Sequence, residues 1–454
     1  MSKRNFILLI IILIITILVV FGFLYLQQGT GTLGEEGEGT NFISQFNPFG
    51  TGGKSPTTPK GDTPTDVSGY EPGPEQEEVK LKKVSSMPVA GFTVYTKERL
   101  VEIPPVVAPT TPPAENTTTP EETTPKTTTT TKPTPPATEF VSALRYVDRA
   151  TGNIYQTFAD KIEERKFSGT MIPKVYEAFF GNKGESVIMR YLKEDGNIII
   201  TFVGNLPKEV LGGDTTGENE ITGTFLPEDI RDVSLSGDKG SILYLFEVGE
   251  NIVGTTLNLT TNKKSQIFDS PFTEWLPEWP NNKLMTLTTK PAASVPGFVY
   301  GVDPINNKNL HQIFGNINGL TTLTSPDGKS ILYGNNNLAL GIYHTDTKTS
   351  EVLGVRTLPE KCVWGSVSDV IYCGVPKVIT GAGYPDIWYR GEVSFGDQFW
   401  KIDLTTGNAT LLLDPTTVEG GEETDSIKLA LDTEENYLFF VNKKDSFLWE
   451  LELK

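Results

Sequence analysis

Ser325-Pro326-Asp327-Gly328-Lys329-Ser330-Ile331-Leu332-Tyr333 is the clearest indication of the fold, because it joins a tight turn to the start of a strand. Within it, Pro326 fixes its backbone φ at about −65°, Asp327 can bond its own backbone, and Gly328 accepts a positive φ. Residues 330–333 supply β-branched and aromatic side chains that suit a buried strand. The stretch therefore predicts a turn that leads into a β-strand.

Weaker copies of this turn and strand recur along the chain. The copies span residues 181–189, 236–244, 280–285, 365–372 and 432–439. Recurrence at about 40 to 50 residues is typical of a β-propeller, in which each repeat forms one four-stranded blade. We therefore expect an all-β fold made of radial blades.

A second pattern, in which Asp and a Thr/Gly/Asn turn follow an apolar strand, predicts another hairpin in most repeats. It spans residues 146–153 and 400–408, with variants at residues 258–262, 302–307 and 345–349. The turn at residues 325–333 and its five copies indicate six blades. A hairpin expected in residues 89–106 would add a seventh, so we predict seven blades. Six or eight blades also fit the pattern.

The end of the chain predicts how the ring closes. Residues 447–453 match the third strand of a blade, and the sequence then ends without a fourth. An unpaired sheet edge invites aggregation. We therefore expect residues 79–84 to supply the missing strand by pairing with residues 449–453.

The N-terminal part predicts a membrane anchor. Residues 6–26, from Phe6 to Leu26, form an apolar run. A helix over this run would span about 31 Å, which matches a hydrocarbon core of about 30 Å. Lys3 and Arg4 precede the run and acidic residues follow it, so residues 1–5 are expected in the cytoplasm and the propeller outside the cell membrane. The alternative is a cleaved signal peptide, although no Ala-x-Ala pattern follows the run.

Two polar tracts interrupt the chain before the main repeats. Residues 27–78 are rich in Gly, Pro, Thr and Glu, which favours a disordered tether. Residues 106–138 are dominated by Thr and Pro and predict an extended excursion inside the first blade. The propeller would then occupy residues 79–454. Alternatively, the second tract is the true linker and residues 79–106 form a separate piece.

Composition limits the chemistry that the chain can perform. It has 39 Lys and Arg against 57 Asp and Glu, a net charge of −18, so its surface repels phosphate backbones and we expect no nucleic-acid binding. His311 and His344 lie apart, without Cys or His at ligand spacing, so we expect no zinc site and no Ser/His/Asp triad. No pattern indicates a metal, a cofactor or a catalytic residue.

Cys362 and Cys373 are the two cysteines of the chain. If the hairpin turns at residues 366–369, they face each other across antiparallel strands, where Cα atoms lie about 4.5 to 5.5 Å apart and a disulfide can form. Such a bridge persists outside the cytoplasm. The alternative is a pair of buried free thiols.

The candidate ligand-binding residues are Trp275, Trp279 and Lys290. The two tryptophans belong to the block at residues 275–280, and Lys290 belongs to a long loop at residues 288–297. Exposed aromatic side chains at a propeller mouth could stack on sugars or hold a peptide. The alternative is that both tryptophans pack within the blade.

The repeat at residues 325–333 resembles that of TolB-like bacterial propellers, over roughly residues 79–454. With the anchor, residues 145–155 and the tryptophan block, the chain also resembles uncharacterised bacterial membrane-anchored propeller proteins. This resemblance implies a binding or scaffold role, and it supplies no catalytic residue.

Two functions follow from these patterns. The first is a non-enzymatic extracytoplasmic module that binds a protein or a cell-envelope polymer. The second is a glycan-active hydrolase or lyase that uses carboxylates at the propeller mouth. Three acids that converge on one ring face would favour the enzyme, whereas a mouth of Trp, Lys and neutral loops would favour the binding module.

Overall fold

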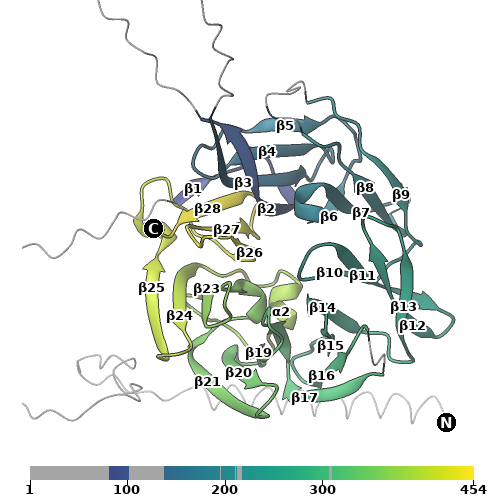
Figure 1. Ribbon diagram of the computed structural model, residues 1–454. Coiled ribbons are helices and arrows are strands. Elements are labelled where there is room, and N and C mark those ends of the chain that lie inside the picture. The colour runs from purple at the N-terminus through teal and green to yellow at the C-terminus, as the bar shows by residue number, and fades with distance from the viewer. Residues whose placement is uncertain (1–80, 102–136, 195, 210, 212–216, 306–308) are drawn as a thin grey trace, which may run out of the picture. The chain divides into compact units, whose positions relative to one another are not determined.

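The computed structural model describes residues 81–101, 137–194, 196–209, 211, 217–305 and 309–454. Over these ranges the chain forms seven four-stranded antiparallel sheets, arranged as the blades of one ring (Figure 1). The predicted all-β, seven-bladed propeller is therefore confirmed.

Each blade uses strands that are consecutive in sequence, except the last. Blade 1 consists of β2 (Val89–Leu100), β3 (Thr138–Asp148), β4 (Ile154–Phe158) and β5 (Arg165–Ser168), and blade 2 consists of β6 (Val175–Gly181), β7 (Ser186–Leu192), β8 (Ile199–Asn205) and β9 (Thr222–Phe225). Blade 3 consists of β10 (Asp232–Leu235), β11 (Ser241–Val248), β12 (Asn251–Asn258) and β13 (Lys264–Ser270). Blade 4 consists of β14 (Trp275–Asn281), β15 (Leu284–Thr289), β16 (Pro296–Val302) and β17 (His311–Asn318).

The remaining three blades follow the same plan. Blade 5 consists of β18 (Thr321–Thr324), β19 (Ser330–Gly334), β20 (Ala339–His344) and β21 (Thr349–Arg356). Blade 6 consists of β22 (Cys362–Trp364), β23 (Val370–Pro376), β24 (Asp397–Asp403) and β25 (Asn408–Leu413). Blade 7 consists of β26 (Ser426–Leu431), β27 (Tyr437–Asn442), β28 (Leu448–Glu452) and β1 (Leu81–Lys83). The short helices are η2 (Asn182–Gly184), η3 (Pro359–Lys361), α2 (Asp386–Tyr389) and η4 (Pro415–Thr417).

The turn at residues 325–330 joins β18 to β19. Asp327 Oδ1 accepts hydrogen bonds from the Ser325 hydroxyl at 2.6 Å and from the Lys329 backbone N–H at 3.0 Å. Gly328 has a φ of +75°, which a side chain would strain. The other five predicted copies also connect the first and second strands of their blades. Local turn chemistry therefore sets the repeat.

The second pattern is displaced in blade 1. In blades 3 to 6 it joins the third strand to the fourth, but the turn after Asp148 joins β3 to β4, the second and third strands of blade 1. The hairpin expected in residues 89–106 is wrong, because residues 89–100 form the single strand β2. β2 pairs along its length with β3, although residues 102–136 separate them in sequence, and this displaces the second pattern. Most of the Thr/Pro-rich tract lies in that interval, outside the described residues.

The ring closes through the strand that was predicted to complete the last blade. β1 pairs antiparallel with β28, with Lys82 opposite Glu450, and the Val84 N–H donates to the Leu448 carbonyl at 2.8 Å. This confirms the predicted partners. The first and last parts of the propeller sequence are thereby joined in one sheet.

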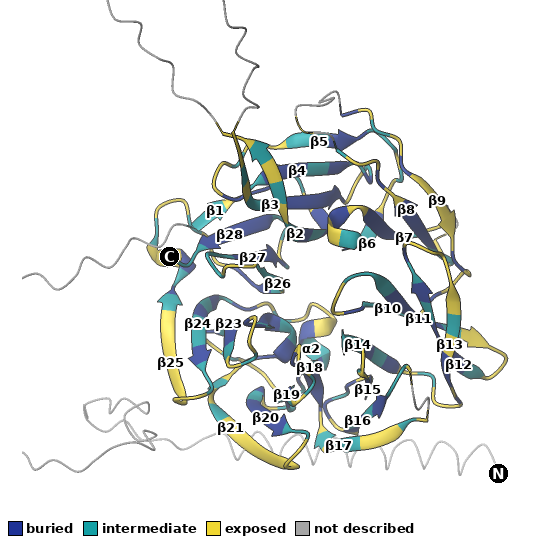
Figure 2. Cartoon of the chain, viewed as in Figure 1, coloured by how far each residue is buried: buried dark blue, intermediate teal, exposed yellow. Residues whose placement is uncertain are grey.

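The core lies between neighbouring sheets. Tyr146 of blade 1 packs with Phe439 of blade 7, and Phe399 of blade 6 packs with Phe440 and Trp449 of blade 7. Outer strands are far more exposed, as Figure 2 shows for β9, β21 and β25. Burial between blades therefore holds the ring, and the outer strands β9, β21 and β25 face solvent.

The predicted membrane span at residues 6–26 and the tether at residues 27–78 lie outside the described residues. Within the described ranges, no helix combines the length and apolar character needed to cross a bilayer.

One carboxylate lies inside the closing sheet. Glu450 is fully buried on β28, and its two carboxylate oxygens have no hydrogen-bond partner among the described residues. The Lys82 ammonium lies 3.8 Å away. Burial raises the pKa of Glu450 to about 8, and the Lys82 charge only partly opposes this. The fold therefore favours the protonated acid at neutral pH.

We expect Glu450→Gln to stabilise the protein more at pH 8 than at pH 5. The raised pKa means that the folded state binds a proton that the unfolded state releases above about pH 4.3, so stability falls as pH rises toward 8. Gln lacks this titration, and the gain should be roughly 3 to 4 kcal/mol larger at pH 8. Urea unfolding at both pH values, with the exposed Glu247→Gln as control, measures it. An equal effect at both pH values would contradict the assignment.

Candidate functional site

A cavity of about 450 Å³ lies where the first strands of blades 3 to 5 meet η3 and α2. Figure 1 shows α2 toward the middle of the ring, close to β14. The polar residues that line the cavity are Asp232, Glu278, Lys290, Thr322, Glu360 and Tyr389. Three carboxyl groups from different parts of the ring therefore share one cavity.

Glu278 is held by hydroxyl and backbone donors from blade 5. Its Oε2 accepts a hydrogen bond from the Thr324 N–H at 2.6 Å, and its Oε1 accepts from the Thr322 hydroxyl at 3.3 Å. Thr322 and Thr324 in turn bond the hydroxyls of Thr288 and Thr286, at 2.6 and 2.8 Å. This ladder fixes the carboxylate on the β14 side of the cavity.

Glu360 and Tyr389 form the opposite pair. The Tyr389 hydroxyl donates to Glu360 Oε1. Burial raises the pKa of Glu360 to about 7, and the nearby Glu278 and Asp232 charges add to this increase. Burial and the Glu360 charge raise the pKa of Tyr389 well above its usual value, so Tyr389 keeps its proton and acts as a donor.

Asp232 is the third carboxyl group. Burial raises its pKa to about 7, and repulsion from Glu177 adds to the increase, while Arg190 and Lys290 oppose it. Asp232 and Glu360 therefore both change charge near neutral pH. A cation that entered the cavity would favour their ionised forms.

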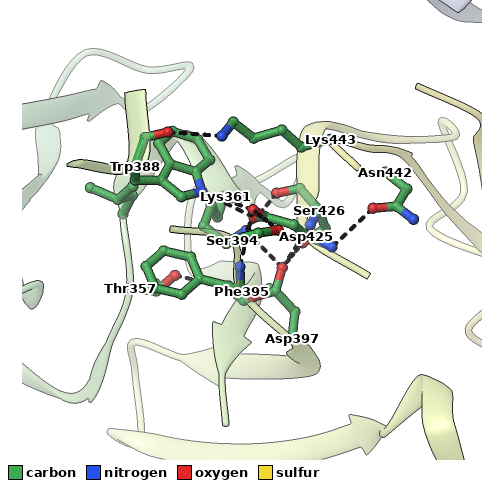
Figure 3. Close-up of polar contacts among 12 residues, drawn as sticks. Thr357, Lys361, Trp388, Ser394, Phe395, Asp397, Asp425, Ser426, Asn442 and Lys443 are labelled. Carbon is green, nitrogen blue, oxygen red and sulfur yellow. Dashed lines mark hydrogen bonds and ion pairs between the residues drawn. The ribbon is translucent and has the colours of Figure 1, made fainter. Parts of the chain in front are cut away.

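A fully buried ion cluster supports this cavity (Figure 3). Lys361 Nζ lies 2.5 Å from Asp425 Oδ1 and 2.7 Å from Asp397 Oδ2, and all three side chains have zero exposure. The same ammonium donates to the Ser426 carbonyl at 3.0 Å. One cation thus connects η3 to the starts of β24 and β26.

Further donors satisfy the two carboxylates. Asp425 accepts from Trp388 Nε1 at 3.0 Å and from the Phe395 N–H at 3.1 Å, and Asp397 accepts from the Ser426 N–H at 2.7 Å. Burial alone would raise the pKa of Asp425, but Lys361 and these donors hold it below its usual value. One ammonium does not compensate both acids, and burial raises the pKa of Asp397.

The cluster positions the cavity through sequence neighbours. Lys361 directly follows Glu360, and Trp388 directly precedes Tyr389. Lys443 adds a hydrogen bond from its ammonium to the Trp388 carbonyl at 2.8 Å. The ion cluster therefore fixes the two backbone segments that present the Glu360–Tyr389 pair.

The three sequence-predicted binding residues do not share one surface. Trp275 is only 6% exposed and packs edge-on against Phe272 and Tyr300 in the blade core. Trp279 lines a separate cavity near Asp238. Lys290 does line the central cavity, with its ammonium 3.0 Å from Glu274.

The sequence block at residues 275–280 does reach the cavity, through Glu278, which was not predicted from the sequence. Glu278 stands between the two tryptophans on a first strand. An acid within an otherwise apolar and aromatic strand was the signal available for it. Asp232, Glu360 and Tyr389 carry no comparable local signal.

Cys362 and Cys373 lie opposite each other on β22 and β23, with an S–S distance of 2.13 Å and a Cα–Cα distance of 4.1 Å. Cys362 immediately follows Lys361. The bridge thus ties the end of η3 to the neighbouring strand. In the part of the chain that the structure describes, no group of three or more His, Cys, Asp or Glu residues is arranged to hold a metal ion.

Solved structures of similar fold include two oligogalacturonate lyases and a TolB protein. The lyase from Vibrio parahaemolyticus is 8% identical, with a TM-score of 0.47 over 69% of this chain and 86% of that one. A lyase in complex with manganese is 10% identical, with a TM-score of 0.46 over 69% and 85%. TolB from Acinetobacter baumannii is 12% identical, with a TM-score of 0.36 over 67% and 60%.

No protein-family model and no curated protein matches the chain. Structural similarity at the level above transfers neither an activity nor a partner.

We expect Lys361→Met to lower the free energy of unfolding by about 3 to 5 kcal/mol, because it leaves two buried carboxylates without their cation. Lys290→Met is the matched control, since its ion pair with Glu274 is more than half exposed and should contribute less than about 1 kcal/mol. Urea unfolding compares them. Equal losses in the two variants would contradict a structural role for the cluster.

Proposed function

We propose that the protein is a membrane-anchored extracytoplasmic binding module whose central cavity receives a cationic group of a protein partner. The observation that carries this proposal is the convergence of Asp232, Glu278 and Glu360 on one cavity. Lys290 is the cation that shares this lining, and its ammonium is engaged by Glu274. A lysine or arginine side chain of a partner would supply the missing positive charge.

The fixed geometry of the cavity supports recognition. Glu278 is bonded to the blade 5 backbone, and Glu360 is bonded to Tyr389 above the buried ion cluster. A receptor whose acids are already in place loses little conformational entropy when it binds. The acidic net charge of −18 would also attract a cationic partner.

The proposed location rests on the apolar run at residues 6–26 with Lys3 and Arg4 before it. The run would cross the bilayer once, with the N-terminus in the cytoplasm and the ring outside. The bridge between Cys362 and Cys373 supports this placement, because disulfides persist in oxidising compartments. A cell-envelope polymer that bears amino groups would satisfy the same cavity.

A second candidate function is a glycan-active hydrolase or lyase. It is favoured by the same convergence of Asp232, Glu278 and Glu360, which was the arrangement expected of an enzyme. Burial also raises the pKa of Asp232 and of Glu360 to about 7, which suits a general acid or base. In such an enzyme Glu360 would donate or accept the proton, and the hydrogen bond from the Tyr389 hydroxyl would orient the Glu360 carboxyl group. Glycan cleavage that Glu360→Gln abolishes, measured by mass spectrometry of the products, would establish this alternative.

We expect the full chain to bind an acetylated peptide with a single lysine, and to bind its glutamine counterpart at least tenfold more weakly. Glu278→Gln and Glu360→Gln should each weaken binding about tenfold, because each removes one negative charge from the cavity. Affinity should rise from pH 6 to pH 8, since Asp232 and Glu360 are protonated below about pH 7.

Isothermal titration calorimetry measures these affinities, with Glu247→Gln on an exposed part of β11 as the matched control. An affinity that is independent of pH, or that Glu247→Gln lowers as much as Glu278→Gln does, would refute the cavity as the binding site.

A further inference from the structure

A second cavity, of about 410 Å³, lies between blades 1 and 2 and has the opposite character. The basic residues that line it are Lys97, Arg99, Arg145, Arg165, Lys183 and Lys208. This concentration of positive charge stands on a chain whose net charge is −18. The cavity shares no lining residue with the central cavity.

One carboxylate of the chain already shows how this pocket binds an oxyanion. Glu209 follows β8 of blade 2, and its oxygens accept from Lys97 Nζ at 2.6 Å and Arg165 Nη2 at 2.6 Å. Gln156 Nε2 donates at 2.9 Å and Arg145 Nη2 at 3.2 Å. The four donors come from β2, β3, β4 and β5, so blade 1 forms the receptor.

The receptor is rigid at its base. The Arg145 side chain is 4% exposed and lies over the rings of Phe167 and Tyr95, at 4.2 and 5.2 Å from their centroids. It also donates to the Gly184 carbonyl at 2.7 Å. Because these contacts hold the guanidinium in place, an anion would meet a preorganised donor.

Glu209 does not compensate the charge that surrounds it. Three cations, Lys97, Arg145 and Arg165, contact this single carboxylate. Burial lowers the pKa of Lys97, although Glu209 opposes this, and the neighbouring arginines lower it further. Glu98 and Glu185 also line the cavity, and Arg99 is paired with Glu139 and Asp160. The six lining cations still outnumber these four carboxylates and Glu209, so among the described residues a small surplus of positive charge remains.

A polar group next to this surplus lacks a partner. Tyr95 lines the cavity, and its hydroxyl is shielded from solvent and has no hydrogen-bond partner among the described residues. A buried hydroxyl without a partner costs about 1 to 3 kcal/mol. An oxyanion in the cavity would compensate the excess cations, and it would accept from this hydroxyl once the side chains that cover the hydroxyl move aside.

We propose that the cavity between blades 1 and 2 binds a small oxyanion, a carboxylate or a phosphate, beside Glu209, with Tyr95, Lys97 and Arg165 as donors. Glu209 then limits the affinity, because its negative charge repels the incoming anion. The opposite signs of the two cavities make this site independent of the proposed binding of a cationic group.

The test titrates the purified full chain with citrate and, separately, with inorganic phosphate in a low-salt buffer, by isothermal titration calorimetry. We expect at least one of the two anions to bind. Arg165→Gln should weaken the binding of that anion about tenfold. Tyr95→Phe should weaken it about threefold, because this variant loses the hydroxyl and keeps the ring contact to Arg145. Glu209→Gln should bind at least threefold more tightly. Tighter citrate binding assigns a carboxylate ligand, and tighter phosphate binding assigns a phosphate ligand.

Arg231→Gln is the matched control, since Arg231 is an exposed arginine that pairs with Glu247 elsewhere on the ring. The affinity of Arg231→Gln for the anion should equal that of the wild type. Melting temperatures confirm that each variant is folded. The proposal is overturned if neither anion binds the wild type or Glu209→Gln. It is also overturned if folded Glu209→Gln binds no more tightly, or if Arg231→Gln weakens binding as much as Arg165→Gln.

Discussion

A single buried ammonium connects the parts of the molecule on which the central cavity depends. Lys361 binds Asp397 and Asp425 with no exposure to solvent, and Asp425 in turn anchors Trp388. Such a cluster adds little net stability over an apolar core, but removing one member is very costly. Its effect here is geometric, because the segments that it joins present Glu360 and Tyr389 to the cavity. The position of these two side chains is therefore set by a buried charge arrangement and not by the blade repeat.

The ring also separates charges of opposite sign. First strands and the helices near the middle bring carboxyl groups together around the central cavity, whereas blade 1 directs Lys97, Arg145 and Arg165 toward blade 2. Each site draws its residues from several strands that are far apart in sequence. The propeller makes this arrangement possible because neighbouring sheets pack face to face over a continuous core, so that connections and strand ends can vary without loss of the fold.

The fold could be predicted from sequence because its signals are local. The turn at residues 325–330 is determined by Pro326, Asp327 and Gly328, and ring closure follows from a blade that lacks one strand. The site could not be predicted in the same way. Lys361 has an ordinary sequence context, and only the three-dimensional structure shows that two acids from distant strands meet it. Trp275 was a candidate for the mouth, with packing inside the blade as the alternative, and β14 directs it into the blade core.

A crystal structure of the full chain grown with ethylammonium would show whether the central cavity is a preformed acidic receptor. We expect an ammonium nitrogen within hydrogen-bonding distance of at least two of the carboxyl groups of Asp232, Glu278 and Glu360, with the Lys361 cluster unchanged. An ammonium ion that is absent from this cavity at saturating concentration, or carboxyl groups that point away from one another, would contradict a preformed receptor.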